Sequence, residues 1–166
     1  MENLLKKETV KRVQEFISQF DSKLKILILD NTARTAKDAA NSLKCEVGAI
    51  VKSLLFRANE SFLICLIAGD RRCSLNKLKK IIDKKDVSMA NADQVKEVTG
   101  FTIGGVSPIA HLHEIEIYID NELSRFEFIY AAAGHPNCIF KIDFDNLINI
   151  TKGSIKNITE WEIQKL

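Results

Sequence analysis

Two adjacent apolar runs constrain the fold of this chain most strongly. Residues 49–56 and 61–68 are each eight residues long, and residues 57–60, with an Asn among them, separate the two. Apolar runs of this length, joined by a short link that contains a turn residue, are typical of a β-hairpin. Because the first run is apolar almost throughout rather than alternating, we expect its strand to be buried on both faces.

Periodicity predicts the remaining elements. Apolar residues recur at helical spacing over 4–20, 74–82 and 91–98, a helix of small residues follows the cap at Thr35, and a short helix covers 143–149. Strands are expected at 24–29, 115–119, 126–130 and 138–142. The pattern predicts an α+β fold: a mixed, mostly antiparallel, curved or barrel-like sheet of about seven strands with five surrounding helices. The length of 166 residues predicts a single domain over 1–166.

Composition and charge exclude several classes of protein. The net charge of +2, from 24 basic and 22 acidic residues, excludes a histone-like protein that coats nucleic acid through bulk charge. The longest apolar stretch, Phe62 to Ala68, is far shorter than the ~20 residues of a membrane helix. The first residues lack the apolar core of a signal peptide. We therefore expect a cytoplasmic protein that does not enter a membrane.

The cysteines and histidines do not form a metal-binding pattern. None of the four cysteines belongs to a C-x-x-C pair, and no histidine lies at zinc-like spacing from two of them. His111 and His113 are two residues apart but lack a third ligand. We expect four reduced, mostly buried thiols, no bound metal and no cofactor.

Lys52 is the first residue that indicates chemistry, because it interrupts the apolar run 49–56. Lysine is rarely buried without a partner. One interpretation is a strand-end lysine whose stem packs while its ammonium reaches water. The other is an ammonium that points into a pocket, where it would bind an anionic or carbonyl oxygen.

Two glycine-containing segments are further candidates. Residues 102–108 hold Gly104, Gly105, Ser107 and Pro108, a combination that allows several backbone N–H groups to face one oxygen. Residues 132–137 hold Gly134, His135 and Asn137, and the imidazole could exchange a proton near neutral pH. The alternative for both segments is an ordinary turn. Neither matches a Walker loop or a dinucleotide-binding fingerprint.

A basic cluster lies between residues 71 and 85, with only Asp83 opposing it. Its members are Arg71, Arg72, Lys77, Lys79, Lys80, Lys84 and Lys85. Such a cluster is either the solvated face of a small helix or a patch for a phosphate backbone. No aromatic residue lies within it, which argues against stacking on single-stranded bases there.

The order of these motifs resembles the YbaK/ProX family, the free-standing relatives of the editing domain of bacterial prolyl-tRNA synthetases. The motifs are T-A-x-D-A-A from Thr35, I-V-K-S-L around Lys52, A-G-D-R-R, V-T-G-F-x-I-G-G-V-S-P and A-G-H-P-N. The resemblance runs from about Thr35 to Ile150. The combination of I-V-K-S-L with G-G-V-S-P at this separation is its most specific part.

The resemblance implies roles for particular residues. It places the family's catalytic lysine on Lys52, its G-x-x-x-P loop on 104–108 and its second glycine-containing loop on 134–137. The His-Pro pair is like that of the branch that clears alanine from tRNA. That branch carries Asn after the lysine, whereas Ser53 follows here. Ser53 and the side chains of the two loops are the expected substrate contacts.

The implied activity is hydrolysis of mischarged aminoacyl-tRNA, chiefly tRNA for proline carrying a small wrong amino acid such as Ala, Cys, Ser or Thr. Lys52 and the backbone amides near Gly104 and Gly105 would stabilise the developing oxyanion. The attacking group is water or a neighbouring hydroxyl of the substrate. The expected partners are aminoacyl-tRNA and, as a further candidate, prolyl-tRNA synthetase. The alternative is a non-catalytic protein of the same fold that binds tRNA or a small ligand.

Overall fold

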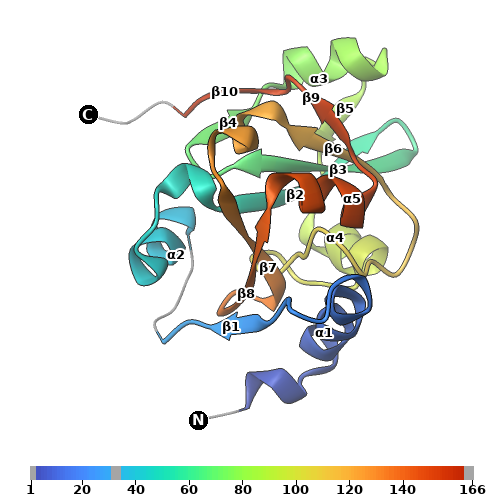
Figure 1. The fold of residues 1–166 in the computed structure, drawn as a ribbon. Helices are drawn as coiled ribbons and strands as arrows, with labels where there is room; N and C mark the ends of the chain where they lie inside the picture. The colour runs from blue at the N-terminus through green and yellow to red at the C-terminus, as the bar shows by residue number, and fades with distance from the viewer. Residues whose placement is uncertain (1–2, 31–34, 163–166) are drawn as a thin grey trace.

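The predicted hairpin forms the centre of the structure, a computed structural model that describes residues 3–30 and 35–162 (Figure 1). β2 (Val51–Ala58) pairs antiparallel with β3 (Ser61–Ala68) over their full length. Only residues 59 and 60 link them, so the turn is two residues shorter than predicted. Asn59 has φ +52°, in the left-handed region that Asn tolerates better than most residues.

Five strands make the sheet that contains this hairpin, in the order β5-β2-β3-β6-β9. The added strands are β5 (Val87–Met89), β6 (Glu116–Asp120) and β9 (Ser154–Lys156). Pairing is antiparallel at β2, whereas β3–β6 and β6–β9 are parallel. Ile64 and Leu66 face one apolar cluster, and Leu63 and Cys65 face another. The sheet is therefore buried on both sides, as the continuous apolar runs predict.

A second, antiparallel sheet has the order β1-β8-β7 and lies beside the start of β2. Its strands are β1 (Ile26–Ile28), β7 (Phe128–His135) and β8 (Cys138–Asp143). A single parallel bridge, Ile50–Tyr130, connects it to the segment that enters β2. β4 (Arg71–Cys73) pairs separately with β10 (Thr159–Trp161).

The α+β class with a mixed, mostly antiparallel arrangement is confirmed. The described residues contain ten strands rather than about seven. The four that periodicity missed, β4, β5, β9 and β10, have three residues each, which is too short for an alternation to be visible in sequence.

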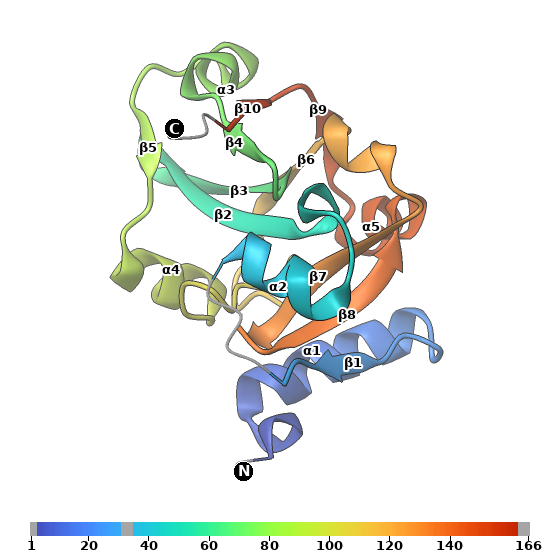
Figure 2. The same cartoon turned by 90° about the vertical axis from the view of Figure 1, so that its left-hand side faces the viewer.

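Within the described residues, five α-helices surround the sheets: α1 (Glu8–Phe20), α2 (Ala36–Leu43), α3 (Leu75–Ile82), α4 (Ala92–Thr99) and α5 (Phe144–Thr151). The described residues also form three short 3-10 helices: η1 (Leu4–Lys6), η2 (Val47–Ala49) and η3 (Asn121–Arg125). Residues 4–20 do not form one helix, because Lys7 is extended between η1 and α1. α1 packs against β7, and α3 lies at the other end of the molecule (Figure 2).

Side-chain caps fix the helix starts that the sequence predicted. The Thr35 hydroxyl accepts a hydrogen bond from the Asp38 N–H, and Asn91 forms a capping box with Gln94. Cys65 and Cys138 are buried, and the other two cysteines are half-buried. Over the described part of the chain, every helix is too short or too polar to cross a membrane.

Candidate active site

A pocket of about 1020 Å³ lies along the first half of β2. β5 pairs with Phe56–Ala58 and so covers only the far half of that strand. The near half opens into the pocket, whose walls come from six other segments: the start of α2, η2, residues 69–70, residues 103–106, the β7–β8 hairpin and residues 161–162. Six residues illustrate its lining: Lys52, Ser53, Gly104, Tyr130, Pro136 and Trp161.

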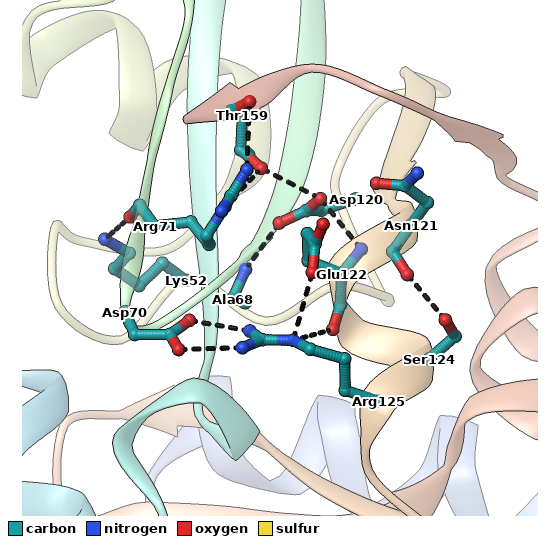
Figure 3. Close-up of polar contacts among 10 residues, drawn as sticks. All are labelled: Lys52, Ala68, Asp70, Arg71, Asp120, Asn121, Glu122, Ser124, Arg125 and Thr159. Atoms are coloured by element: carbon teal, nitrogen blue, oxygen red, sulfur yellow. Dashed lines mark hydrogen bonds and ion pairs between the residues drawn. The ribbon is translucent and has the colours of Figure 1, made fainter. Parts of the chain in front are cut away.

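Lys52 is half-buried in this pocket, and its ammonium does not lie on the open outer surface. Its Nζ donates a hydrogen bond of 2.5 Å to the main-chain carbonyl of Arg71 (Figure 3). Burial lowers the pKa of Lys52, and the carboxylates of Glu162 and Asp70 oppose that effect. An ammonium has three N–H donors, so two remain for a ligand. The interpretation of Lys52 as a charge in a pocket therefore fits this geometry.

Asp70 lines the same pocket but is already neutralised by Arg125. The two form a bidentate ion pair with N–O distances of 2.7 and 2.9 Å (Figure 3). These hydrogen bonds lower the pKa of Asp70. Gly48 packs directly against the pair, where a Cβ would lie 2.8 Å from the Asp70 Oδ2 atom. The pair thus fixes the turn between β3 and β4, from which Arg71 follows.

Arg71, which was predicted as an RNA ligand, is largely buried and serves a structural role in this conformation. It is 7% exposed, and its guanidinium donates to the Thr159 hydroxyl at 3.1 Å and the Thr159 carbonyl at 3.3 Å. The same hydroxyl donates to the buried carboxylate of Asp120 (Figure 3). This network fastens β10 to β4 and brings the following residues, 161 and 162, to the pocket.

The other predicted RNA-binding side chains divide into two groups. Arg72 forms an ion pair with Glu160 at 2.8 Å, and the Lys77 ammonium donates to the Thr159 carbonyl at 2.7 Å. Both therefore hold β10 in the described structure. Lys79 and Lys80 lie on α3, where Lys80 is exposed and Lys79 is half-buried. RNA binding by Arg72, Lys77, Lys79 and Lys80 stays a prediction, and of these four only Arg72 and Lys80 are exposed.

The two glycine-containing loops, residues 102–108 and 132–137, lie in contact with each other. This contact is necessary if both loops belong to one site. An added Cβ on Gly105 would lie 3.0 Å from the backbone N and Cα of His135. Gly104 has φ +93° and lines the pocket, near Pro136. The Gly105 N–H, however, donates to the Thr102 carbonyl at 2.9 Å. In this conformation the Gly105 N–H is already engaged, so Gly104 is the better-placed candidate, and the use of backbone amides near Gly104 and Gly105 as oxyanion donors stays a prediction.

Ser107 and Pro108, which were predicted as substrate contacts, do not line the pocket. Both are buried, and Ser107 has no exposed surface. The carbonyl of Ser107 is 2.7 Å from the Nε2 atom of His111. Burial lowers the pKa of His111, which favours the neutral imidazole. Ser107, Pro108 and His111 therefore stabilise the buried side of the loop that contains Gly104.

Gly134, His135 and Asn137 also lie behind the pocket wall, which is formed here by Pro136. The Asn137 N–H donates to the Nδ1 atom of His135 at 3.0 Å. The Asn137 carbonyl accepts from the Leu29 N–H at 2.8 Å, which ties β1 to the hairpin. Gly134 lies against α1, where its carbonyl accepts from the Thr9 hydroxyl at 2.9 Å. These contacts hold the loop in place, and the substrate contacts expected of its side chains stay a prediction.

Ser53, also predicted as a substrate contact, does line the pocket. Its Oγ atom is buried and makes no hydrogen bond within residues 3–30 and 35–162. A buried hydroxyl without a partner is uncommon and usually has a functional explanation. The Ser53 hydroxyl is therefore available to a polar group of a ligand.

Sequence reasoning missed Trp161 and Glu162, which complete the pocket beside Lys52. They lie about 110 residues from Lys52 along the chain, and the three-residue strand that carries Trp161 gave no periodic signal.

In the part of the chain that the structure describes, no three His, Cys, Asp or Glu side chains are placed to share a metal ion.

Comparison with known proteins fits this arrangement. Residues 30–150 match the model of the family described as the aminoacyl-tRNA editing domain. The chain belongs to this family. The resemblance of the motifs to YbaK/ProX proteins is therefore confirmed, and tRNA editing is the function associated with the family.

Relatives of this aminoacyl-tRNA editing domain include whole proteins and parts of larger ones. A proline–tRNA ligase of Caldicellulosiruptor saccharolyticus is 29% identical over 78% of the chain, which spans only 23% of that ligase. The uncharacterized protein YwhH of Bacillus subtilis is 27% identical over 93% of the chain and 99% of its own length. A crystal structure described as a "putative trans-editing enzyme for prolyl tRNA synthetase" superposes with a TM-score of 0.88 and 32% identity, covering 93% of this chain and 98% of that one.

Proposed function

We propose that this chain hydrolyses the ester bond of mischarged aminoacyl-tRNA in trans, chiefly on tRNA for proline that carries a small wrong amino acid. The observation that carries the proposal is the half-buried Lys52 ammonium in a pocket of about 1020 Å³. A pocket near the upper end of the usual range of roughly 300–1,000 Å³ for small-molecule sites can hold an aminoacyl group and part of its nucleoside. The matched family and the relatives support this choice of substrate.

The chemistry needs little from the protein beyond positioning and charge. The α-ammonium group of the substrate already activates the ester. When water or a neighbouring substrate hydroxyl adds to the carbonyl carbon, negative charge develops on the carbonyl oxygen. Lys52 can donate to that oxygen through its two remaining N–H groups, and Gly104 adds a candidate backbone donor. Cleavage of the bond between the carbonyl carbon and the ribose oxygen then releases the tRNA, and the ribose oxygen takes up the proton that the attacking water loses. If a substrate hydroxyl attacks instead, it carries the acyl group as a new ester, and water must cleave that ester in a second step.

The experiment is a deacylation panel on tRNA for proline charged with Ala, Cys, Ser or Thr, with the correctly charged Pro form as the control. We expect rapid release of at least one small amino acid and retention of proline. Binding of these substrates without release would support the non-catalytic alternative instead. We place the reaction in the cytoplasm, and a complex with prolyl-tRNA synthetase is a second, separate expectation that co-purification of the two proteins tests.

A further inference from the structure

Trp161 is the only tryptophan of the sequence and lies at the pocket with 60% of its surface exposed. It belongs to the segment after residue 150, outside the part of the chain that matches the editing-domain model. A large aromatic side chain left exposed at a concave site is typical of a surface that binds a ligand. Neither the motifs nor the proposed chemistry assigns it a role.

The indole ring is supported from behind by Arg71. The guanidinium carbon of Arg71 lies 4.3 Å from the ring centroid, and that of Arg125 lies 5.4 Å away. Arg71 is 7% exposed and is held by two hydrogen bonds to Thr159. Because the guanidinium is buried while the ring is largely exposed, we infer that Arg71 covers the inward face and leaves the outward face open. The ring is therefore positioned before any ligand arrives.

Arg71 also sets the position of the Trp161 ring relative to the ammonium of Lys52. Its main-chain carbonyl accepts from the Lys52 Nζ atom, and its side chain supports Trp161. One residue thus sets the spacing between a cation suited to an ester oxygen and a flat aromatic surface. A terminal nucleoside that carries an amino acid has the same two parts, an ester and a planar base, separated by one ribose.

We propose that Trp161 is the platform on which the terminal adenine of the substrate stacks while Lys52 holds the ester. This proposal rests on the proposed function, since it assumes that the ligand is an aminoacyl nucleoside. Aromatic side chains bind bases in this way with little sequence preference. The stacked base contributes equally in the ground and transition states, so its loss raises KM and leaves kcat unchanged.

The first test uses the fluorescence of Trp161, which needs no catalysis. Adenosine 5′-monophosphate is titrated into the wild type, with excitation where adenine does not absorb, and ribose 5-phosphate serves as the base-free control. We expect saturable quenching by the nucleotide and none by the sugar phosphate. Met89→Ala is the matched control, because Met89 is 59% exposed on β5 and does not line the pocket. Its quenching should equal that of the wild type.

The second test measures deacylation of a mischarged tRNA by Trp161→Ala and Trp161→Phe. We expect Trp161→Ala to raise KM about 5- to 150-fold, the range for loss of one stacked base, with kcat and melting temperature unchanged. Phenylalanine should restore most of the loss, because it retains an aromatic face.

Three results separate the proposals. Absence of quenching together with a wild-type KM for Trp161→Ala overturns the platform while leaving the deacylase intact. The platform is also overturned if Trp161→Ala raises KM by an amount that depends on the amino acid, and does so even for an aminoacyl-ribose that lacks a base. The ring would then contact the amino acid and not the base. Base-dependent quenching in a protein that releases no amino acid supports the platform and contradicts the proposed function.

Discussion

The ammonium of Lys52 donates a hydrogen bond to the main-chain carbonyl of Arg71, nineteen residues further along the chain. This contact joins the start of β2, at the open end of the central hairpin, to β4. The side chain of Arg71 in turn holds Thr159, so the last described strand is connected to the candidate catalytic group through one residue. The position of Lys52 therefore depends on Arg71 and Thr159 as well as on the motifs that resemble the editing family.

Replacing Lys52 with Met should leave the fold intact. Burial disfavours the charged form of this side chain, and methionine fills a similar volume without a charge. The cost is one unpaired acceptor on Arg71, so we expect the free energy of unfolding to fall by about 1–3 kcal/mol at most. Urea denaturation measures the difference. A loss of more than about 3 kcal/mol would identify Lys52 as a structural residue instead.

The activity should fall at alkaline pH through loss of the Lys52 proton. Because burial lowers the pKa of Lys52, the ammonium is lost at a lower pH than for an ordinary lysine. Glu162 raises that pKa, so Glu162→Gln should move the alkaline limb of the kcat profile to still lower pH. The profile is measured after subtraction of spontaneous ester hydrolysis. An unchanged limb in Glu162→Gln would show that Lys52 does not carry the titration.

Gly105→Ala should weaken catalysis by separating the two loops. The new Cβ would lie 3.0 Å from the backbone of His135, which cannot move as a flexible side chain would. We expect a stability loss of about 1–3 kcal/mol, typical of overpacking, and a reduced kcat because the loop shifts Gly104. Gly104→Ala is the comparison: its Cβ meets only Pro136 at 3.4 Å, so its cost comes from the positive φ alone. Equal kcat in Gly105→Ala and wild type would exclude this coupling.

The surface lysines of α3 should affect binding of tRNA rather than chemistry. Reversal of Lys79 and Lys80 to Glu removes two candidate phosphate contacts, so KM should rise at low salt with kcat unchanged. The slope of log affinity against log salt should shrink by about one for each lysine. Lys6→Glu with Lys11→Glu is the matched control on the N-terminal segment. A larger effect in the control pair would move the tRNA surface to that segment.

The sequence predicted the central elements because their patterns were long. Eight-residue apolar runs made the β2–β3 hairpin visible, and capping residues such as Thr35 and Asn91 marked helix starts. The strand β10 was not predictable, because it has only three residues and becomes a strand by pairing with β4, which lies almost 90 residues earlier in the chain. Such pairing depends on tertiary structure rather than on local propensity.

The candidate site was predictable only in part for a similar reason. Lys52 broke an apolar pattern and was therefore visible, whereas Trp161 and Glu162 reach the pocket through distant hydrogen bonds that no local pattern encodes. The burial of Arg71 was not predictable, because a cluster of basic residues in the sequence does not reveal which guanidinium is buried. Ser107 and Asn137 belong to the recognised loops, but their contacts brace the backbone instead of facing the pocket.

The most direct test of the account is single-turnover hydrolysis of a mischarged tRNA for proline by the wild type and by Lys52→Met, at saturating enzyme and neutral pH. Circular dichroism of both proteins provides the check on folding. The account predicts release of the amino acid by the wild type and a loss of at least about 100-fold in Lys52→Met, the effect of removing one donor to the oxyanion. A folded Lys52→Met protein whose rate stays within about threefold of the wild type, a difference of only ~0.6 kcal/mol in the barrier, would contradict it.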